Sequence, residues 1–336
     1  MALSFEQIIN DIRQKKYNKL YFLMGEEPYF IDKIVDEIED TVIDEPDRVF
    51  NQKIFFGRDT NIKDVVSETR NYSMFGGLKV VIVKEAQELK DIEELEKFID
   101  KLTDSAILVF AYKYKTLDKR RTLYKKLDKS GAVFFESKKL YDSYIPGWIT
   151  GVLRGEGYSI SERSSRILAD YLGNDLCKIR NELTKLKMAI PAGKKVIDEG
   201  DIEYNIGISK EFNTFELQNA LGSGDMVKLA RIIDHFGNNP KENPIIFTTV
   251  MLYSYFTKLL KVHYSPVKTN DGIANYLGVT PYFAKDYIAG AKRYSIADCV
   301  RCIVVLREID KKSKGYGTSS VSEKELYSEL LYKLTH

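Results

Sequence analysis

The sequence predicts an α/β domain followed by a series of helices, and two patterns along the chain indicate this. Through the first 140 residues, short apolar runs of strand length recur, separated by stretches with helical periodicity. From about Tyr141 the strand-like runs cease, and amphipathic helical patterns follow one another to the C-terminus. A chain of 336 residues is long for one domain, so this change of pattern is the first expected domain boundary.

The apolar runs of the first part are predicted to form a parallel sheet. Most of them carry apolar side chains at consecutive positions, which is typical of strands buried on both faces. The five runs are Leu20–Met24, Ile54–Phe56, Val80–Val83, Ala106–Ala111 and Ala132–Phe135. Helical stripes lie between them, as in Phe30–Ile38 and Ile92–Leu102. Repeated alternation of strand and helix predicts a doubly wound fold that ends near residue 140.

The second part is predicted to be entirely helical apart from one short segment at Val196 and Ile197. The expected helices are Tyr141–Tyr158, Glu162–Met188, Phe215–Leu221, Met226–Phe236, Asn243–His263, Asp271–Leu277, Pro281–Ala291, Ile296–Lys314 and Ser322–Leu334. Two pairs have the spacing of a capping box at helix starts: Asn213 with Glu216, and Ser322 with Glu325. Three glycines stand where helices are expected to end: Gly173, Gly222 and Gly237. A turn-rich stretch, Pro191–Lys195, precedes a second expected domain boundary near Lys210.

Composition indicates a globular chain that remains in the cytoplasm. Hydrophobic residues make up 44% and charged residues 30%, which is sufficient for packed cores. The start of the chain lacks the basic and apolar regions of a signal peptide, and no run approaches the ~20 apolar residues of a membrane span. Three cysteines do not make a disulfide scaffold, and a net charge of +2 does not by itself indicate nucleic acid binding.

The first strand leads into a turn and a helix, which is the setting of a Walker A phosphate loop. When Gly-x-x-x-x-Gly-Lys-Ser/Thr is placed on the sequence from Gly25, the second glycine falls on Phe30, the lysine on Ile31 and the hydroxyl residue on Asp32. Ten acidic residues also lie between Glu26 and Asp47, and they would repel a polyphosphate. The loop is therefore interpreted as a degenerate phosphate loop, or as a plain strand-to-helix turn. Both interpretations exclude ordinary ATP binding.

Other parts of an ATPase site are missing as well. After the strand Val80–Val83, where a magnesium-binding acidic pair would stand, the sequence has Lys84 and Glu85. The segment after the last strand, Ser137–Lys139, has no arginine that could act on a neighbouring subunit's nucleotide. The sequence thus predicts an ATPase scaffold without catalytic residues.

The cysteines and histidines do not suggest a metal or catalytic site. Cys299 and Cys302 form a single CxxC inside a helical pattern, and a zinc site needs about four ligands. We interpret them as two cysteines on one helix face. The three histidines, His235, His263 and His336, lie far apart in the sequence. No catalytic residue, metal or cofactor is expected.

Two segments are candidate binding surfaces. The segment Lys113–Lys129 holds eight basic residues with interleaved tyrosines, a composition that fits either contacts with a phosphate backbone or a solvated helix face. The candidate DNA contacts within it are Lys119, Arg120, Arg121, Lys125 and Lys126. Met74 and Phe75 follow the expected helix Ile62–Tyr72 and precede two glycines. They either fold back on the core or anchor in a partner's hydrophobic pocket.

In order and spacing across the whole chain, these features resemble the delta subunit family of the bacterial DNA polymerase III clamp loader. The matching segments are Leu20–Tyr29, Ser73–Val83, Leu172–Leu176, Glu182–Leu186, Phe215–Ala220 with Gly224 and Asp225, Leu306–Asp310 and Lys314–Gly317. The resemblance implies three domains: an AAA+-like module at 1–140, a helical lid domain at 141–210 and a helical collar domain at 211–336.

The resemblance also implies a function and partners. Members of the family bind no ATP; they bind the sliding clamp (beta), open it, and join the gamma/tau and delta prime subunits in a pentameric ring that places the clamp on primed DNA. The apolar pair that the family inserts into the clamp aligns with Met74 and Phe75, and Met74 stands where many relatives have leucine. Two rival functions are an active ATPase or DNA-processing motor on the same fold, and a non-catalytic DNA-binding adaptor. No association with a membrane is expected.

Overall fold

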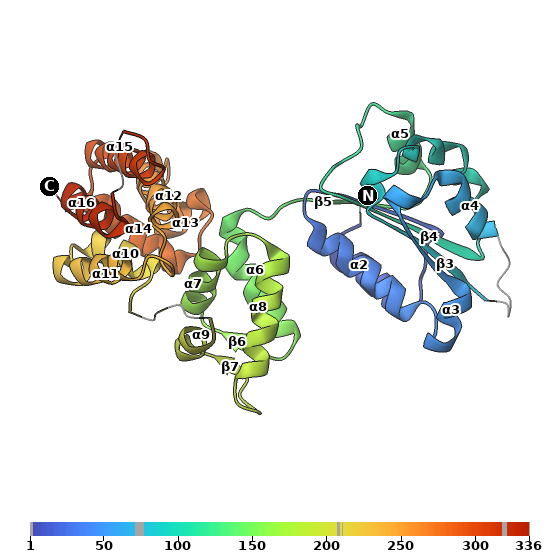
Figure 1. The fold of residues 1–336 in the computed structure, drawn as a ribbon, viewed down its shortest axis with the longest axis horizontal. Helices are drawn as coiled ribbons and strands as arrows, with labels where there is room; N and C mark the ends of the chain where they lie inside the picture. The colour runs from blue at the N-terminus through green and yellow to red at the C-terminus, as the bar shows by residue number, and fades with distance from the viewer. Residues whose placement is uncertain (1–2, 71–76, 207–208, 210, 318–320, 336) are drawn as a thin grey trace. The chain divides into compact units, whose positions relative to one another are not determined.

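A computed structural model of the chain describes residues 3–70, 77–206, 209, 211–317 and 321–335 (Figure 1). The chain divides into two compact units, Met1–Leu140 and Tyr141–His336. Each unit has its own core and is described by itself. The finer division of the second unit near Lys210 stays a prediction.

The first unit is built on a five-stranded sheet in which every paired strand is parallel. The strands are β1 (Leu20–Gly25), β2 (Gln52–Phe56), β3 (Lys79–Lys84), β4 (Ala106–Lys113) and β5 (Val133–Ser137). Their order is β2-β3-β4-β1-β5, so β1 lies between β4 and β5. In this register Leu23 lies opposite both Ala111 of β4 and Phe135 of β5. The predicted parallel α/β fold is confirmed.

Alternate residues of β1 serve two separate cores, one on each face of the sheet. Tyr21 and Leu23 pack toward α1 (Phe5–Arg13) and α2 (Pro28–Thr41). Leu20, Phe22 and Met24 belong to the other core, which also contains apolar residues of the helices on that face, α4 (Ile62–Arg70) and α5 (Thr122–Lys129). Figure 1 shows α2 and α4 on opposite sides of the sheet. Burial on both faces explains the near-continuous apolar run of this strand.

One predicted helix of the first unit has a different geometry. The stretch Ile92–Leu102 forms two 3₁₀ helices, Ile92–Lys97 and Ile99–Lys101, instead of one α-helix. The reason lies in the spacing of its apolar residues, because Ile92, Leu95 and Phe98 recur every third residue. That spacing matches the period of a 3₁₀ helix. Helix α1 and the short α3 (Arg48–Asn51) were not predicted.

The second unit is helical except for one small parallel ladder between β6 (Ser159–Ile160) and β7 (Val196–Ile197). Its first four helices are α6 (Ile145–Gly155), α7 (Glu162–Leu172), α8 (Leu176–Ala189) and α9 (Glu199–Ile206). The remaining helices are α10 (Thr214–Ser223), α11 (Met226–Asn238), α12 (Ile245–Tyr264), α13 (Asn270–Leu277), α14 (Pro281–Arg293), α15 (Ile296–Ser313) and α16 (Glu323–Thr335). The predicted all-helical second part is therefore confirmed.

Helix boundaries of the second unit follow local signals. The single helix predicted over Glu162–Met188 is two helices, because Gly173 has a φ of 77° and ends α7. The side chain of Asn213 accepts a hydrogen bond from the backbone N–H of Glu216, as its spacing predicts. Gly222 does not end α10, which continues to Ser223; a Cβ at Gly222 would lie 2.9 Å from the Tyr255 hydroxyl. Close helix packing thus explains that glycine.

Helix α12 differs from the expectation that no segment approaches a membrane span. By length and composition alone it could cross a membrane, with a mean hydropathy of 1.3 in its most apolar window. Its buried residues, among them Leu252, Phe256 and Leu259, pack inside the second unit, where α12 contacts α14 and α15. A buried central helix explains the apolar composition.

Candidate functional site

The turn after β1 holds the glycine of the degenerate phosphate loop in a crowded position. Gly25 has a φ of 140°, and a Cβ at this residue would lie 1.9 Å from the backbone oxygen of Ser137. Its backbone N–H donates a hydrogen bond to the carbonyl of Lys115 at 3.0 Å. Glycine is therefore required here by the close approach of β5 to β1, independently of any ligand.

Backbone donors at the start of α2 are also bonded within the chain. The carboxylate of Glu27, which is 3% exposed, accepts a hydrogen bond from the backbone N–H of Tyr29 at 3.0 Å. The N–H of Glu27 points to the carbonyl of Ser137 at 3.4 Å, and the Ser137 hydroxyl donates to the Glu27 carbonyl at 2.7 Å. In a phosphate loop, N–H groups at this position bind the ligand. Here one of these N–H groups, that of Tyr29, donates to the Glu27 carboxylate instead.

The three residues that replace the glycine, lysine and hydroxyl of a Walker A loop have structural contacts. Phe30 packs against Phe5, with ring centroids 4.9 Å apart. Ile31 is fully buried in the core on the α2 face of the sheet. Asp32 forms an ion pair with Lys113 of β4, with Nζ 3.1 Å from the carboxylate. Lys113, at this end of the sheet, thus binds a carboxylate of α2.

The ends of β3 and β5 carry no acidic pair and no arginine. Lys84, in the position of the magnesium-binding acid, forms an ion pair of 2.7 Å with Glu39 of α2. Glu85 has a left-handed φ of 54°. After β5, Lys138 and Lys139 are exposed. The carboxyl ends of the strands therefore form a surface with interleaved lysines and carboxylates.

Most of the candidate DNA contacts are paired with acidic side chains. The pairs are Lys119 with Glu136 at 3.9 Å, Arg120 with Asp118 at 2.8 Å, Arg121 with Glu93 at 3.2 Å and Lys126 with Asp100 at 2.5 Å. Lys125 is exposed and, within the described residues, has no ion pair. Since exposed ion pairs are weak, the four cations can exchange partners, but the local positive charge is much reduced.

The predicted clamp-binding residues Met74 and Phe75 lie outside the described residues. Before them in the sequence α4 ends at Arg70, and after them β3 begins at Lys79. Gly77 has a left-handed φ of 93°. The assignment of Met74 and Phe75 stays a prediction.

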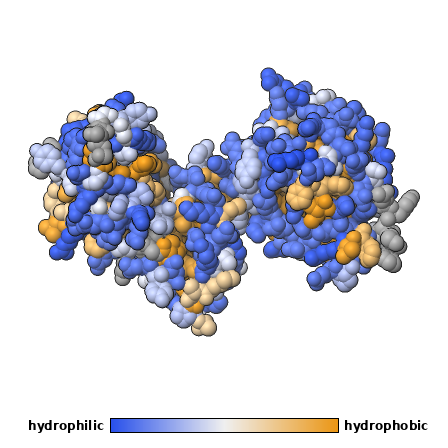
Figure 2. Space-filling model, in the orientation of Figure 1, coloured by the Kyte–Doolittle hydropathy of each residue, from blue (hydrophilic) through white to orange (hydrophobic). Residues whose placement is uncertain are grey.

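The remaining sequence candidates are structural. Cys299 and Cys302 are fully buried on one face of α15, as predicted, and burial raises the pKa of their thiols to about 11 and about 12. In the part of the chain that the structure describes, no group of three His, Cys, Asp or Glu side chains could hold a metal ion. The surface in Figure 2 is mostly hydrophilic, with separate apolar patches on each unit.

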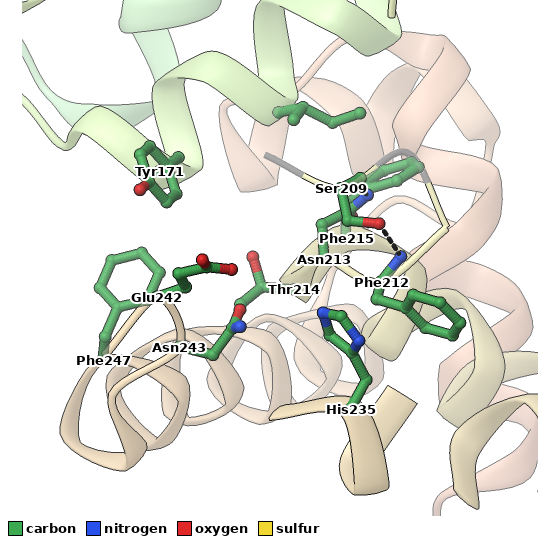
Figure 3. A pocket seen from close by; sticks show the side chains of 11 residues that line it. Tyr171, Ser209, Phe212, Asn213, Thr214, Phe215, His235, Glu242, Asn243 and Phe247 are labelled. Carbon is green, nitrogen blue, oxygen red and sulfur yellow. Dashed lines mark hydrogen bonds between the residues drawn. The ribbon is translucent and has the colours of Figure 1, made fainter. Parts of the chain in front are cut away.

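Described residues of the second unit line a small cavity and a larger hollow. The small cavity, of about 30 Å³, lies where His235 stacks on Phe212 with ring centroids 4.5 Å apart (Figure 3). It has the volume of about one water molecule. The larger hollow, of about 700 Å³, is lined by residues of α6, α7, α13 and α14, including Gly151 and Arg154. Neither brings together a recognisable catalytic group.

Sequence reasoning missed Glu27, Lys113 and Ser137 as the residues that occupy the strand ends. A local signal was present for Glu27, since an acidic residue followed by proline is typical of the start of a helix. The contact between Lys113 and Asp32 joins residues 81 apart in the sequence, and no local pattern predicts it.

Comparison with known proteins finds a family model and individual relatives that are similar to this chain. Residues 21–137 match the family model described as "DNA polymerase III, delta subunit". Over these residues the chain is similar to the DNA polymerase III delta subunits. The family resemblance expected from the sequence is therefore confirmed.

Individual relatives agree with this assignment. The chain is 24% identical to DNA polymerase III subunit delta of Bacillus subtilis over 332 residues, covering 95% of this chain and 93% of the relative. Its structure is similar to that of the B. subtilis DNA clamp loader delta protein, with a TM-score of 0.56 and 21% identity, covering 99% and 100% of the two chains. The fold is thus that of a clamp loader delta subunit. The RuvB branch migration motor of Thermotoga maritima is more distant, at a TM-score of 0.36, 10% identity and coverage of 86% and 85%.

Proposed function

We propose that this chain binds the sliding clamp of DNA polymerase III and opens it, without binding ATP itself. The B. subtilis protein of similar structure is a DNA clamp loader delta protein, and this chain would supply the clamp-opening activity in such a loader. The subunit would act in the cytoplasm, as a non-catalytic member of the complex.

One observation carries the claim that no ATP binds: the β1–α2 turn is closed by contacts within the chain. Glu27 caps α2 with a carboxylate, so a phosphate approaching the same helix end would meet a buried negative charge. Ile31 offers an apolar core side chain where a phosphate-binding lysine is needed. Asp32 has a carboxylate at the position of the Mg²⁺-binding hydroxyl of a Walker A loop, and this carboxylate forms an ion pair with Lys113.

The clamp-binding residues in this proposal are Met74 and Phe75. A thioether and an aromatic ring side by side suit an apolar pocket, because methionine adapts its shape and the ring supplies a large contact area. Gly76 and Gly77 follow directly, and glycines permit backbone angles that turn such a pair outward. Burying each side chain is worth about 1.5–3 kcal/mol.

The mechanism is a shift between two states of the clamp. If this chain binds an open or distorted ring more tightly than the closed ring, binding itself favours opening. The shift is limited by the ratio of the two affinities, so a large population of open rings needs strongly preferential binding. ATP would act in other subunits of the loader, where its binding exposes or hides the clamp-binding surface.

The domains would divide these tasks. Residues 1–140 would bind the clamp, 141–210 would form the lid domain, and 211–336 would join the gamma/tau and delta prime subunits in a pentameric ring on primed DNA.

The test is a binding experiment with a purified sliding clamp and with Mg·ATP. The chain should co-elute with the clamp in size-exclusion chromatography without nucleotide. Titration calorimetry with Mg·ATP should give no heat of binding. Failure to co-elute would contradict the clamp role, and micromolar ATP binding would contradict the closed phosphate loop.

A further inference from the structure

We propose that Tyr114, together with Lys115 and Lys138, is a stacking site for single-stranded nucleic acid at the carboxyl ends of the strands of the first unit. The proposal rests on the proposed role in placing a clamp on DNA, and it names the part of the chain that contacts the strand. The sequence placed Tyr114 and Lys115 in the basic segment Lys113–Lys129, but the candidate DNA contacts named within it were Lys119, Arg120, Arg121, Lys125 and Lys126, and Lys138 lies outside that segment.

Tyr114 directly follows β4 in an unusual backbone conformation. Its φ is 64°, which a bulky residue rarely adopts, and its side chain is 63% exposed. Only two other described residues besides glycine, Lys15 and Glu85, have positive φ. Such strain persists only where the surroundings impose it, often at binding sites.

The backbone on both sides of Tyr114 is fixed, so the strained turn is held rigidly. The N–H of Lys113 donates to the side-chain carbonyl of Gln87 at 3.0 Å, and the Lys113 ammonium binds Asp32. On the other side, the carbonyl of Lys115 accepts the N–H of Gly25 at 3.0 Å. These anchors present an aromatic ring to solvent from the end of a central strand. In open α/β sheets, this edge is where ligands bind.

Two exposed lysines without an ion pair among the described residues follow β4 and β5, the strands on either side of β1. Lys115 contacts Gly25 through its backbone, and the backbone of Ser137, which precedes Lys138, also touches Gly25. Lys115 and Lys138 are exposed, and neither has an ion pair among the residues described. The segment Lys119–Lys126, by contrast, has four of its five candidate cations engaged with carboxylates.

Three of the acidic groups beside these strand ends are engaged within the chain. Asp32 binds Lys113, Glu136 lies 3.9 Å from Lys119, and Glu27 caps α2; Glu26 is exposed between them. An aromatic ring with flanking lysines combines a platform for a base with contacts to the phosphates beside it, which is the usual recognition of single strands. An apolar segment of a protein partner fits this surface less well, because it would contact one aromatic ring and several charged side chains.

The test measures binding of a fluorescently labelled oligothymidylate to the full chain at low salt. Stacking on one aromatic ring is worth about 1–3 kcal/mol, so Tyr114→Ala should weaken binding by about 5- to 150-fold. Tyr114→Phe should bind like the wild type. Tyr114→Gly should lose the same affinity while its melting temperature stays equal or rises, because glycine relieves the left-handed strain. This variant separates lost stacking from lost folding.

The lysines give an independent readout. Lys115→Gln and Lys138→Gln should each reduce the slope of log affinity against log salt by about 0.7, whereas the Tyr114 variants should leave that slope unchanged. Tyr204→Ala, at a tyrosine that is 90% exposed in the second unit, is the matched control and should bind normally. Tyr114→Ala should also retain clamp binding, and the Met74→Ala, Phe75→Ala double variant should retain oligonucleotide binding.

Two results would overturn the inference. In the first, the wild type fails to bind the oligonucleotide. In the second, Tyr114→Ala binds the oligonucleotide with unchanged affinity; if this variant also loses binding to another loader subunit, the ring belongs to a protein contact. If the oligonucleotide binds through Tyr114 and the clamp does not bind at all, the proposed function fails and the stacking site remains.

Discussion

The carboxylate of Glu27 accepts a hydrogen bond from the backbone N–H of Tyr29 at 3.0 Å, and both residues are buried. In a phosphate loop the N–H groups at the start of this helix face the ligand, and here a side chain of the same chain occupies one of them. Pro28, at the first helical position, has no N–H to offer. The start of α2 is thus stabilised without a nucleotide.

We expect Glu27→Ala to lower the free energy of unfolding by about 0.5–2 kcal/mol, because the variant loses the helix cap. The neighbouring Glu26 is exposed and caps nothing, so Glu26→Ala should change stability by less than about 0.5 kcal/mol. Urea denaturation of both variants measures the difference. Equal stability of the two variants would show that the cap contributes little.

Replacing Ile31 by lysine restores the missing residue of a Walker A loop, but we expect no ATP binding. Ile31 is fully buried in the core beside α2, so the variant loses apolar burial and places an ammonium group among apolar side chains. The free energy of unfolding of Ile31→Lys should be lower than that of the wild type by about 3 kcal/mol or more. Asp36→Lys, at an exposed position of the same helix, should cost less than about 1 kcal/mol. A stable Ile31→Lys variant that binds Mg·ATP in calorimetry would disprove the account of this loop.

Replacing Met74 and Phe75 together by alanine should weaken clamp binding by about a hundredfold or more. The estimate follows from 1.5–3 kcal/mol for each buried side chain and a factor of ten for each 1.4 kcal/mol. The melting temperature should stay close to that of the wild type, because interface residues do not support the core of the free chain. If the melting temperature falls sharply while the folded fraction keeps its clamp affinity, both residues belong to the core.

The pair formed by Asp118 and Arg120 predicts a measurable pH dependence in the basic segment. The hydrogen bond from the Arg120 guanidinium lowers the pKa of Asp118 to about 2, from 3.8 in the unfolded chain. Since the folded pKa is the lower one, the pair contributes stability above pH 3.8 and loses it as the pH falls toward 2. Carboxyl NMR should give a midpoint near 2 for Asp118, and Arg120→Gln should return it toward 3.8. A midpoint near 3.8 in the wild type would mean that the pair does not form in solution.

Where side chains repeat at the period of an element, the sequence was sufficient to predict the fold. The five strands of the first unit were found from runs such as Val80–Val83, because burial on both faces demands apolar residues at consecutive positions. The stretch Ile92–Leu102 was predicted with the wrong helix type, since a spacing of three is compatible with both the α and the 3₁₀ geometry.

The sequence predicted which phosphate-binding residues the site lacks, but not which residues occupy it instead. Phe30, Ile31 and Asp32 showed from their chemistry that a phosphate-binding lysine and hydroxyl are missing. What occupies the strand ends instead depends on contacts between distant segments, such as Lys113 with Asp32 and Gly25 with Lys115. Tyr114 has its left-handed conformation between two residues with such contacts, Lys113 and Lys115, and no local sequence pattern predicts it.

The central claim is that this chain opens the clamp, and a ring-opening measurement tests it most directly. A sliding clamp labelled with a donor and an acceptor fluorophore across its subunit interface is mixed with the full chain, without ATP. We expect energy transfer to fall as the chain saturates the clamp, and to stay high with the Met74→Ala, Phe75→Ala double variant at the same concentration. Saturating binding of the wild-type chain with no change in energy transfer would contradict the claim.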